Sequence, residues 1–562
     1  MREIIKNFNI ITKGQRKKLL FVFVIMTLQI FLDVMSIGSL LPIFTQITSG
    51  NTINFSNQYL EKIKLIFDIE YNIILFSIIT LILFSLKNLF VFFYIKISSN
   101  FFSYLTIFHQ EKIMKNYLSS PYSFFLKKNS SFFIREVLDE TKQLNSNFIQ
   151  PILAMILNVI TILFFVILLF SVNFIYTTFL IIFSVIFYLV FTLIFKKKIL
   201  FFGEQRRIQN YKMIDNVKQM FEGFRELKIY NKQNLFLEDL KKRFNRMANI
   251  TVARSLISNT PRLFLEVILV LMFLILILLN KNNTEQYLAT IGIFTASAFR
   301  IMPNVLSLIR SYQRMNYSET ALKNLLPVLD KKKADNKTEI EENFKFEKSL
   351  EFKKIDFNHN EETQIFKDLN ILIKKNSCIG IKGESGSGKS TFVDILCGFL
   401  KINSGSVFID DKQKDIYDSK VWLNKISYIQ QSVYIFDSNI FTNISLEKDE
   451  DKINKDLIKQ ILNQLNMFDF LDKNDAISLG ELGSKISGGQ AQRIGIARAL
   501  YRKSEILIFD ESFNSLDQKN YEQILNLINK LKKNKTIIII SHNNNDFLPC
   551  EKVYEIKNYK II

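Results

Sequence analysis

A glycine-rich segment in the second half of the chain has the residue types and spacing of a phosphate-binding loop. Residues 383–390 read GESGSGKS, follow a short apolar run that begins at Cys378, and precede a helical pattern. Glycines let a backbone wind around phosphates with its N–H groups pointing inward. In such a loop Lys389 supplies charge to the β- and γ-phosphates, and the Ser390 hydroxyl is a ligand for Mg²⁺. The predicted phosphate-binding residues are Gly383, Glu384, Ser385, Gly386, Ser387, Gly388, Lys389, Ser390 and Thr391.

Two later apolar runs end in side chains that suit metal binding and water activation. The run EILIFDES (505–512) brings Asp510 to Mg²⁺ through water, and Glu511 then faces an attacking water as general base. The run TIIIISH (536–542) ends in His542, which is well placed to touch a γ-phosphate. Gln431 follows the run KISYI and can reach both the metal and the water. Each residue also has a structural alternative: an acidic turn, a structural histidine or an ordinary surface glutamine.

A second glycine-rich segment opens a helical pattern. In SKISGGQAQRIGIARAL (484–500), Ser487, Gly488, Gly489 and Gln490 precede a helix that continues through Arg493 and Arg498. The free N–H groups of a helix N-terminus, together with a serine hydroxyl, favour contact with an anion. The segment therefore predicts an anion contact, although nothing nearby in the chain supplies the anion.

The elements that must position these residues form a soluble α/β pattern, which begins near residue 347. The first half of the chain is different, because it carries six apolar segments near 19–47, 72–96, 148–170, 174–195, 259–280 and 286–310. Each is long enough to cross a hydrocarbon core, which needs about 20 helical residues. We therefore predict a six-span α-helical transmembrane domain (1–328), a polar linker (329–346) and an α/β P-loop NTPase domain (347–562).

The placement of positive charge predicts the orientation of the spans. The stretches 16–18, 196–198 and 205–245 are strongly basic, whereas the short loops at 171–173 and 281–285 are almost neutral. By the positive-inside rule both termini face the cytoplasm. Segments 97–147 and 196–258 have helical patterns that extend the spans beyond the bilayer. Residues 57–70 read as an interfacial amphipathic helix on the other side, with a simple outer loop as the alternative.

Charge and cysteine content exclude other functions. The net charge of +20 comes with no basic-aromatic cluster of a nucleic-acid-binding fold, so no nucleic-acid partner is expected. The three cysteines, Cys378, Cys397 and Cys550, have no paired or metal-like spacing and receive no role.

Taken together, the motifs resemble an ATP-binding cassette domain. The phosphate loop, Gln431, ISGGQ (486–490), ILIFDE, SLD (515–517) and SH (541–542) occur in that family's order and spacing. With six preceding spans, essentially the whole chain resembles an ABC exporter half-transporter of the type I fold. The resemblance implies ATP and Mg²⁺ as cofactors, ATP hydrolysis coupled to transport, and a homodimer in which Ser487, Gly488, Gly489 and Gln490 approach the γ-phosphate held by the other subunit.

Other positions are assigned by the same resemblance. Asp517 resembles the aspartate that communicates between the two nucleotide sites, and the turns near 120–126 and 221–227 resemble coupling helices. His359 stands where the family usually stacks a tyrosine on adenine, which implies weaker nucleotide discrimination. A non-hydrolysing nucleotide-gated regulator is the alternative from another class, and Glu511 and His542 argue against it.

Ionisable residues inside the spans indicate what is transported. Such residues are costly in a membrane, and Lys87, Arg262 and Arg300 lie at a common depth of roughly 20–27 Å from the outer ends of their spans. In a dimer they suit a substrate cavity for a phosphate or pyrophosphate headgroup. The alternative is that Asp33 and Glu266 pair with these cations and lock helices together.

Within the exporters, the chain looks most like bacterial flippases for lipid-linked oligosaccharides. That resemblance rests on PRLFLE (261–266), FRIMPNVLSLIRSY (299–312) and the outer helix at 57–70. It implies movement of a polyprenyl-pyrophosphate-linked oligosaccharide from the inner to the outer leaflet of a bacterial cytoplasmic (inner) membrane, in a glycosylation pathway. An exporter of another lipid, a peptide or a drug is the alternative.

Overall fold

The computed structural model describes residues 2–39, 73–172, 174–279, 284–330, 345–360, 363–468, 470 and 477–561. The chain divides into two compact units. Unit 1 comprises Met1–Ser120 and Lys128–Ala334, and unit 2 comprises Pro121–Lys127 and Asp335–Ile562. A short segment from the first half of the chain therefore belongs to the second unit.

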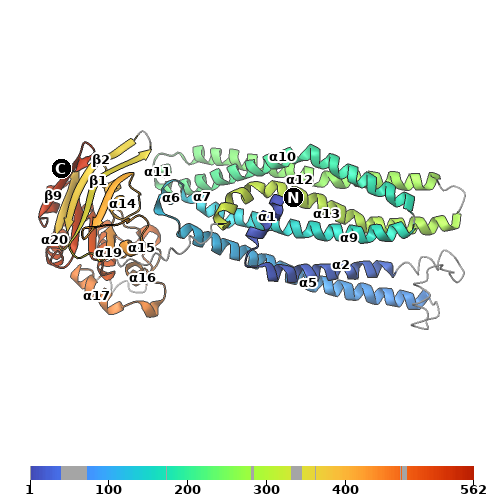
Figure 1. The fold of residues 1–562 in the computed structure, drawn as a ribbon, viewed down its shortest axis with the longest axis horizontal. Helices are drawn as coiled ribbons and strands as arrows, with labels where there is room; N and C mark the ends of the chain where they lie inside the picture. The colour runs from blue at the N-terminus through green and yellow to red at the C-terminus, as the bar shows by residue number, and fades with distance from the viewer. Residues whose placement is uncertain are drawn as a thin grey trace. The chain divides into compact units, whose positions relative to one another are not determined.

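Long helices make up most of unit 1 (Figure 1). They are α2 (Arg16–Gly38), α5 (Ile73–Leu118), α9 (Gln150–Val172), α10 (Phe174–Glu222), α12 (Gln233–Leu279) and α13 (Thr284–Asp330). Shorter elements are α1 (Arg2–Ile11), α7 (Ser130–Arg135), η1 (Glu136–Glu140), α8 (Thr141–Leu144), η2 (Asn145–Ile149) and α11 (Phe224–Ile229). Each predicted apolar segment falls mainly in a long helix, although residues 148 and 149 belong to η2. Residues 40–47, 72 and 280 of these segments lie outside the described residues, as does the predicted outer helix at 57–70.

The surface of these helices is that of a membrane protein. By length and composition, two stretches of the described residues qualify as candidate spans, Ser77–Leu118 and Ser130–Ile167. Along α5, large apolar side chains point outward, with Leu81 68%, Leu89 60% and Phe92 67% exposed. A row of this kind is stable against lipid but not against water.

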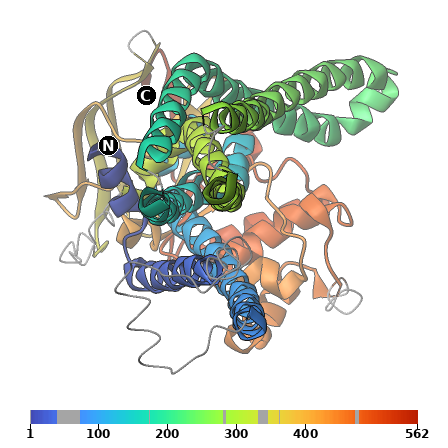
Figure 2. The ribbon, with the colours of Figure 1, turned by 90° about the vertical axis from the view of Figure 1, so that its right-hand side faces the viewer.

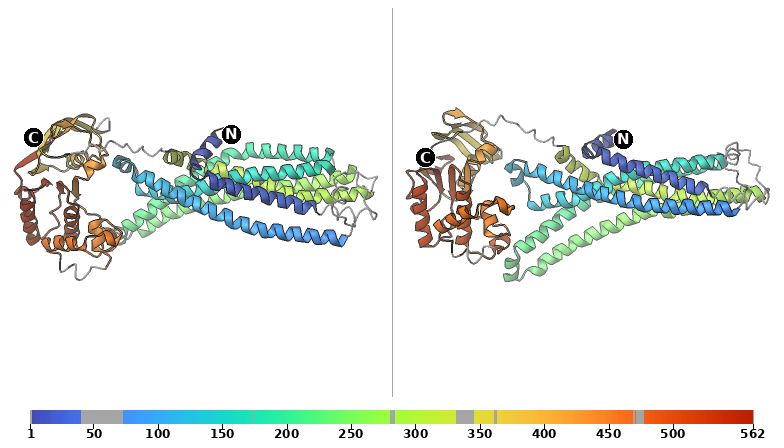
Figure 3. Two further views of the ribbon diagram at one scale, coloured as in Figure 1. Left: turned by 60° about the horizontal axis from the view of Figure 1, so that its bottom comes forward. Right: turned by 90° about the horizontal axis from the view of Figure 1, so that it is seen from below.

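The predicted helical extensions are confirmed. Helix α5 continues to Leu118, and α10 and α12 extend the fourth and fifth apolar segments to a turn at α11. In Figures 2 and 3 this hairpin, drawn in green, diverges from the other helices of unit 1. Its tip is therefore separated from the rest of that unit.

Two sheets form the framework of unit 2. The larger has the order β10-β9-β3-β8-β7-β6, in which β9 to β6 are parallel and β10 is antiparallel to β9. The smaller is antiparallel, with the order β2-β1-β4-β5. The strands are β1 (Ser349–Asn360), β2 (Thr363–Lys374), β3 (Cys378–Gly383), β4 (Ser404–Ile409), β5 (Lys412–Gln413), β6 (Ile426–Ile429), β7 (Ile506–Asp510), β8 (Thr536–Ile540), β9 (Lys552–Lys557) and β10 (Lys560–Ile561).

Helices cover the larger sheet, and the central strands are buried on both faces. Ile537, Ile538, Ile539 and Ile540 are all fully buried, as expected of parallel strands that read as continuous apolar runs. The helical elements are α6 (Tyr122–Leu126), α14 (Lys389–Leu396), α15 (Lys420–Leu423), α16 (Ile440–Ser445), η3 (Glu450–Lys452), α17 (Lys455–Gln464), η4 (Glu481–Gly483), α19 (Gly488–Tyr501), α20 (Gln518–Leu531) and η5 (Asn544–Phe547).

Two features differ from simple expectation. The sulfur atoms of Cys378 and Cys550 lie 3.3 Å apart as free thiols, although 172 positions separate them in sequence. Helix α13 continues through Asp330, so it enters the predicted linker, of which residues 331–344 lie outside the described residues.

Candidate nucleotide-binding site

The phosphate loop (residues 383–390) connects strand β3 to helix α14. Gly386 and Gly388 have φ values of +79° and +104°, which favour glycine, and a Cβ on Gly388 would lie 2.9 Å from Ile365 Cγ2. Lys389, Ser390 and Thr391 form the first turn of α14. The Lys389 ammonium donates to Gly383 O at 2.7 Å and to Glu384 O at 2.9 Å, so it lies across the loop.

Asp510 ends strand β7 in a polar, half-buried position. It accepts a hydrogen bond of 2.7 Å from the hydroxyl of Tyr428. Burial raises the pKa of Asp510, the charge of Glu511 raises it further, and the charge of Lys389 acts in the opposite direction. Oxygen donors such as the Ser390 hydroxyl, the Gln431 amide and the Asp510 carboxylate chemically fit Mg²⁺.

Gln431, Glu511 and His542, which we call the hydrolysis group, come together at one end of the larger sheet. Gln431 Nε2 donates to Glu511 Oε2 at 2.9 Å, and His542 Nδ1 lies 3.6 Å from Glu511 Oε1. The backbone of Glu511 has a φ of +47°, in the left-handed region that side chains rarely adopt. The Glu511 carboxylate thus lies between an amide and an imidazole, an arrangement that suits a base acting on water.

His359 lies beside the phosphate loop. Its Nε2 is 3.5 Å from the Thr391 hydroxyl, and its ring packs edge-on against Phe357, with centroids 5.2 Å apart. The ring is exposed, so it remains available for stacking on a flat partner.

The signature segment (residues 486–490) forms the N-terminus of α19, as its sequence predicts. The Ser487 N–H donates to Gln490 Oε1 at 2.8 Å, and the Gln490 N–H donates to Ser487 Oγ at 3.2 Å. This capping box fixes the first turn. A Cβ on Gly489 would lie 2.8 Å from Ser515 O, which explains why glycine is needed there, and Gly488 also lies next to Ser515. Within the described residues no hydrogen bond joins Ser487 to the phosphate loop.

Asp517 is the N-cap of α20. Its carboxylate accepts from the Asn520 N–H at 2.8 Å, and this backbone hydrogen bond lowers the pKa of Asp517. The charge of Arg493, on the signature helix α19, also lowers the pKa of Asp517. The Asp517 carboxylate therefore remains an anion.

Two residues of the site were not predicted from the sequence. Gln492 is buried, and its amide donates to Gln431 O, so it ties the signature helix to the hydrolysis group. Asp394 lies on α14, where burial and then the charge of Asp510 raise its pKa to about 6. The signal for Asp394 was a carboxylate inside the apolar run 392–396, and the signal for Gln492 was its place two residues after Gln490.

The predicted substrate-cavity cations have different environments. Lys87 Nζ lies 2.6 Å from Asp33 Oδ1, a pair that joins α5 to α2. Arg262 Nε lies 2.8 Å from Glu266 Oε1 on the same helix, and the Arg262 side chain is 64% exposed. Arg300 belongs to α13, and its side chain is outside the described residues. Both pairs of the alternative interpretation are therefore formed, but only the first connects two helices.

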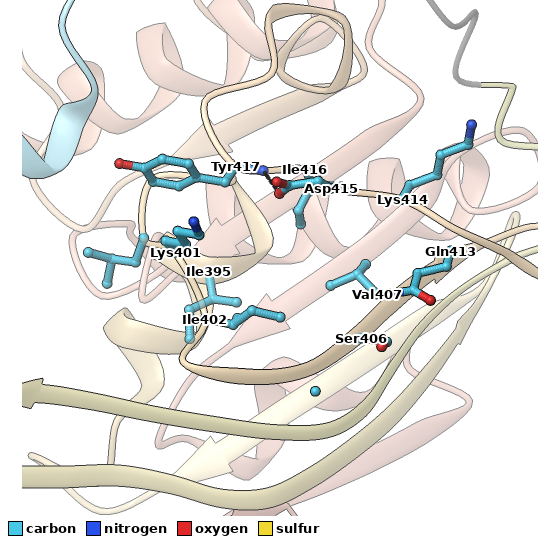
Figure 4. Close-up of a pocket in the computed structure, with 12 residues that line it drawn as sticks. Ile395, Lys401, Ile402, Ser406, Val407, Gln413, Lys414, Asp415, Ile416 and Tyr417 are labelled. Carbon is cyan, nitrogen blue, oxygen red and sulfur yellow. Dashed lines mark hydrogen bonds between the residues drawn. The ribbon is translucent and has the colours of Figure 1, made fainter.

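A separate cavity of about 520 Å³ lies in unit 2 next to the smaller sheet (Figure 4). Its lining residues are Ile395, Leu400, Lys401, Ile402, Gly405, Ser406, Val407, Gln413, Lys414, Asp415, Ile416 and Tyr417. Next to it, Ser123 Oγ lies 3.2 Å from the Tyr417 hydroxyl, and the Tyr122 ring lies 4.6 Å from the Phe399 ring. Helix α6, within the turn expected to act as a coupling helix, thus packs on the nucleotide-binding unit.

The profile described as "ABC transporter" matches residues 366–514, which include the phosphate loop, Gln431, the signature segment and Glu511. The profile described as "ABC transporter transmembrane region" matches residues 19–299, half of the chain. The chain belongs to the ABC transporter family. It is accordingly an ATP-binding, ATP-hydrolysing membrane transporter, with a helical transmembrane domain and a nucleotide-binding domain.

Several proteins resemble this ABC transporter over most of their length. The "ATP-dependent lipid A-core flippase" of Wigglesworthia glossinidia brevipalpis is 27% identical, over 81% of this chain and 79% of its own. The protein of the same name from Escherichia coli (strain K12) is 25% identical, over 77% of this chain and 75% of its own. The solved "Structure of a bacterial Atm1-family ABC exporter with ATP bound" has a TM-score of 0.80 at 17% identity and covers 98% of this chain and 95% of that one. It shows the shared type I exporter fold.

Proposed function

We propose that this ABC transporter is a flippase for a lipid-linked substrate, a polyprenyl-pyrophosphate-linked oligosaccharide, which it moves from the cytoplasmic to the outer leaflet. The observation that carries the ATP-driven part is the hydrolysis group, in which Glu511 is held between Gln431 and His542. In the proposed mechanism Glu511 takes the proton of the attacking water. His542 contacts the γ-phosphate, and Ser390, Gln431 and Asp510 hold Mg²⁺, directly or through water.

The proposed active species is a homodimer. Ser487 and Gly488 of the signature segment are exposed, and within the described residues the segment has no hydrogen bond to the phosphate loop of its own chain. We therefore assign its anion contact to the nucleotide site of another copy. In a two-fold dimer each phosphate loop faces the partner's signature segment, and two nucleotides are enclosed. Binding of ATP then favours the closed state, and hydrolysis removes that preference.

The α10–α11–α12 hairpin supports the same proposal. Apolar side chains at its tip are largely exposed: Phe221 76%, Phe224 54%, Ile229 67% and Tyr230 71%. By contrast, Tyr122 of α6 is packed on the nucleotide-binding unit of its own chain. A tip with this composition is a docking surface, and we assign it to the nucleotide-binding unit of the second copy.

The substrate class rests on two lines of support. The relatives named above are lipid flippases by name, and Arg262 offers an exposed cation at a depth suited to a phosphate-bearing headgroup. Lipid A-core is the second candidate substrate, because it is the one printed in those names. We further propose a bacterial inner-membrane location. Both termini then face the cytoplasm, because the basic stretches lie on the same side of the spans as the termini and positive loops stay in the cytoplasm.

Reconstituted vesicles test the proposal. Purified protein is given ATP and Mg²⁺ together with a polyprenyl-pyrophosphate glycan, lipid A-core or a neutral diacyl lipid. We expect the polyprenyl glycan to raise phosphate release and to become accessible to a glycan-modifying enzyme on the side away from the ATP. The Glu511→Gln variant serves as the control without hydrolysis. If only lipid A-core stimulates phosphate release and is transferred, lipid A-core and not the polyprenyl glycan is the substrate. If no lipid is transferred in an ATP-dependent manner, the protein is not a flippase.

A further inference from the structure

A pocket of about 340 Å³ lies in unit 1 where α10, α12 and α13 pack together. We call it the arginine pocket. Its lining residues are Ile199, Thr251, Arg254, Ser255, Ile257, Ser258, Arg310, Gln313 and Arg314. Three guanidinium groups and three hydroxyl groups from two helices therefore surround one cavity, together with the amide of Gln313.

No carboxylate of the described residues compensates the positive charge of this pocket. Within the described residues no carboxylate forms an ion pair with Arg254, Arg310 or Arg314, and no acidic residue lines the cavity. The nearby acids are already engaged, because Arg206 binds Asp139 at 3.0 Å and Glu140 at 3.1 Å. Arg254 and Arg310 are half-buried and Arg314 is exposed. Three neighbouring cations that no described carboxylate pairs with favour an anion at this position.

Several contacts hold the lining groups in place. The Arg254 guanidinium lies 3.9 Å from the centroid of the Tyr317 ring, and Arg310 donates to Asn259 Oδ1 at 3.4 Å. Gln313 is 5% exposed and donates to Ile257 O at 3.3 Å. Its Oε1 is buried and accepts no hydrogen bond within the described residues, so a ligand with a hydroxyl group would satisfy it.

The depth of the pocket matches that of lipid headgroups. Ser258 immediately precedes the fifth apolar segment, Arg310 ends the sixth, and Ile199 follows the end of the fourth by four residues. At 1.5 Å per residue, Arg254 and Arg314 lie about 6–8 Å beyond the hydrocarbon core. The headgroup layer of a leaflet is about 5–8 Å thick, so these arginines are level with lipid phosphates.

We propose that the arginine pocket binds the phosphate of a membrane lipid whose headgroup also carries a free hydroxyl. The arginines bind the phosphate oxygens, and Gln313 accepts from the hydroxyl. The pocket differs from the cavity site proposed above, because Arg262 lies about 12 Å farther along α12 than Arg254. We place this lipid in the cytoplasmic leaflet, and this assignment alone rests on the proposed function. The proposal of a phosphate site rests on the geometry of the pocket.

Arginine footprinting tests this proposal on the full-length protein. The transporter is placed in nanodiscs of phosphatidylcholine with increasing fractions of phosphatidylglycerol, phenylglyoxal is added, and modified peptides are quantified by mass spectrometry. We expect modification of Arg254, Arg310 and Arg314 to slow at least several-fold as phosphatidylglycerol rises. Arg246, an exposed arginine on the same helix as Arg254, is the internal control and should react at a constant rate.

In a second arm, inorganic phosphate or glycerol 3-phosphate is added to phosphatidylcholine discs. This arm shows whether the pocket binds a lipid headgroup or a soluble anion. Equal modification rates in both lipid compositions, or protection by the soluble anions alone, would overturn the proposal. In Arg310→Gln, loss of one charge-assisted contact should raise the half-saturating phosphatidylglycerol fraction about tenfold. Arg246→Gln should leave it unchanged. Footprinting needs neither ATP nor transport. It can therefore succeed or fail whatever the result of the flippase assay.

Discussion

Asp33→Asn should destabilise the transmembrane unit far more than removal of other span carboxylates. The Lys87 ammonium lies 2.6 Å from Asp33 Oδ1, and the two side chains are only 8% and 21% exposed. The amide of asparagine keeps the shape but removes the negative charge, which leaves a buried ammonium without compensation. Because Lys87 belongs to α5 and Asp33 to α2, the loss weakens the packing of these helices.

The expected magnitude follows from burial. Breaking a buried ion pair by removing one partner costs about 3–5 kcal/mol, whereas an exposed pair one helical turn apart contributes about 0.3–0.5 kcal/mol. The Arg262–Glu266 pair is of the second kind, with side chains 64% and 47% exposed. Glu266→Gln is therefore the matched control, and the two variants should differ by several kcal/mol in the free energy of unfolding.

Circular dichroism during a titration from mild detergent to SDS is the suitable assay. The single tryptophan and all three cysteines lie in the nucleotide-binding unit, so fluorescence and thiol labelling would not report on the helices of unit 1. The double variant Asp33→Asn, Lys87→Met removes both charges and should recover most of the lost stability. If Asp33→Asn unfolds like Glu266→Gln, the pair does not lock the helices, and Lys87 is again available as a substrate-binding cation.

Four further predictions concern the nucleotide and substrate sites. Glu511→Gln should lower steady-state phosphate release by about 10²–10⁴-fold, whereas ATP binding, measured by filter binding, should persist. Turnover near the normal rate would exclude Glu511 as the base. Arg262→Glu should raise the glycolipid concentration for half-maximal ATPase stimulation at least tenfold, and an unchanged value would remove Arg262 from the cavity. Because burial raises the pKa of Asp394 to about 6 from 3.8, wild-type stability should fall as pH rises from about 4 to 6, and Asp394→Asn should flatten this dependence in thermal unfolding. His359→Tyr should increase the preference for ATP over other nucleoside triphosphates in competition binding, and equal preferences would mean that position 359 does not contact the base.

Much of the nucleotide site could be predicted from the sequence because its chemistry is encoded locally. The phosphate loop needs glycines at fixed offsets, since Gly386 and Gly388 adopt positive φ, and these offsets are visible in one short segment. The signature segment is equally local, as its capping box spans only Ser487 to Gln490. The spans were predictable for the same reason, because a bilayer imposes length and apolarity on each helix separately.

What the sequence did not reveal depends on contacts between distant elements. Gln492 reaches the backbone of Gln431 because α19 packs beside the end of β6. Cys378 reaches Cys550 because β3 pairs with β9, which begins two residues after Cys550. The substrate cations show the same limit. Depth along a span was calculable for Lys87, but whether Asp33 lay within 3 Å of it depended on how α2 packs against α5.

We predict that α6 couples the nucleotide site to the spans. The Tyr122 ring contacts Phe399, which follows helix α14 by three residues, and α14 begins with the Lys389 and Ser390 of the phosphate loop. The charge of Asp394 on the same helix also acts on Tyr122, whose pKa is raised first by burial and then by this carboxylate. Because only residues 119–121 separate α5 from α6 in the chain, we expect a nucleotide-dependent shift of α14 to act on the end of α5.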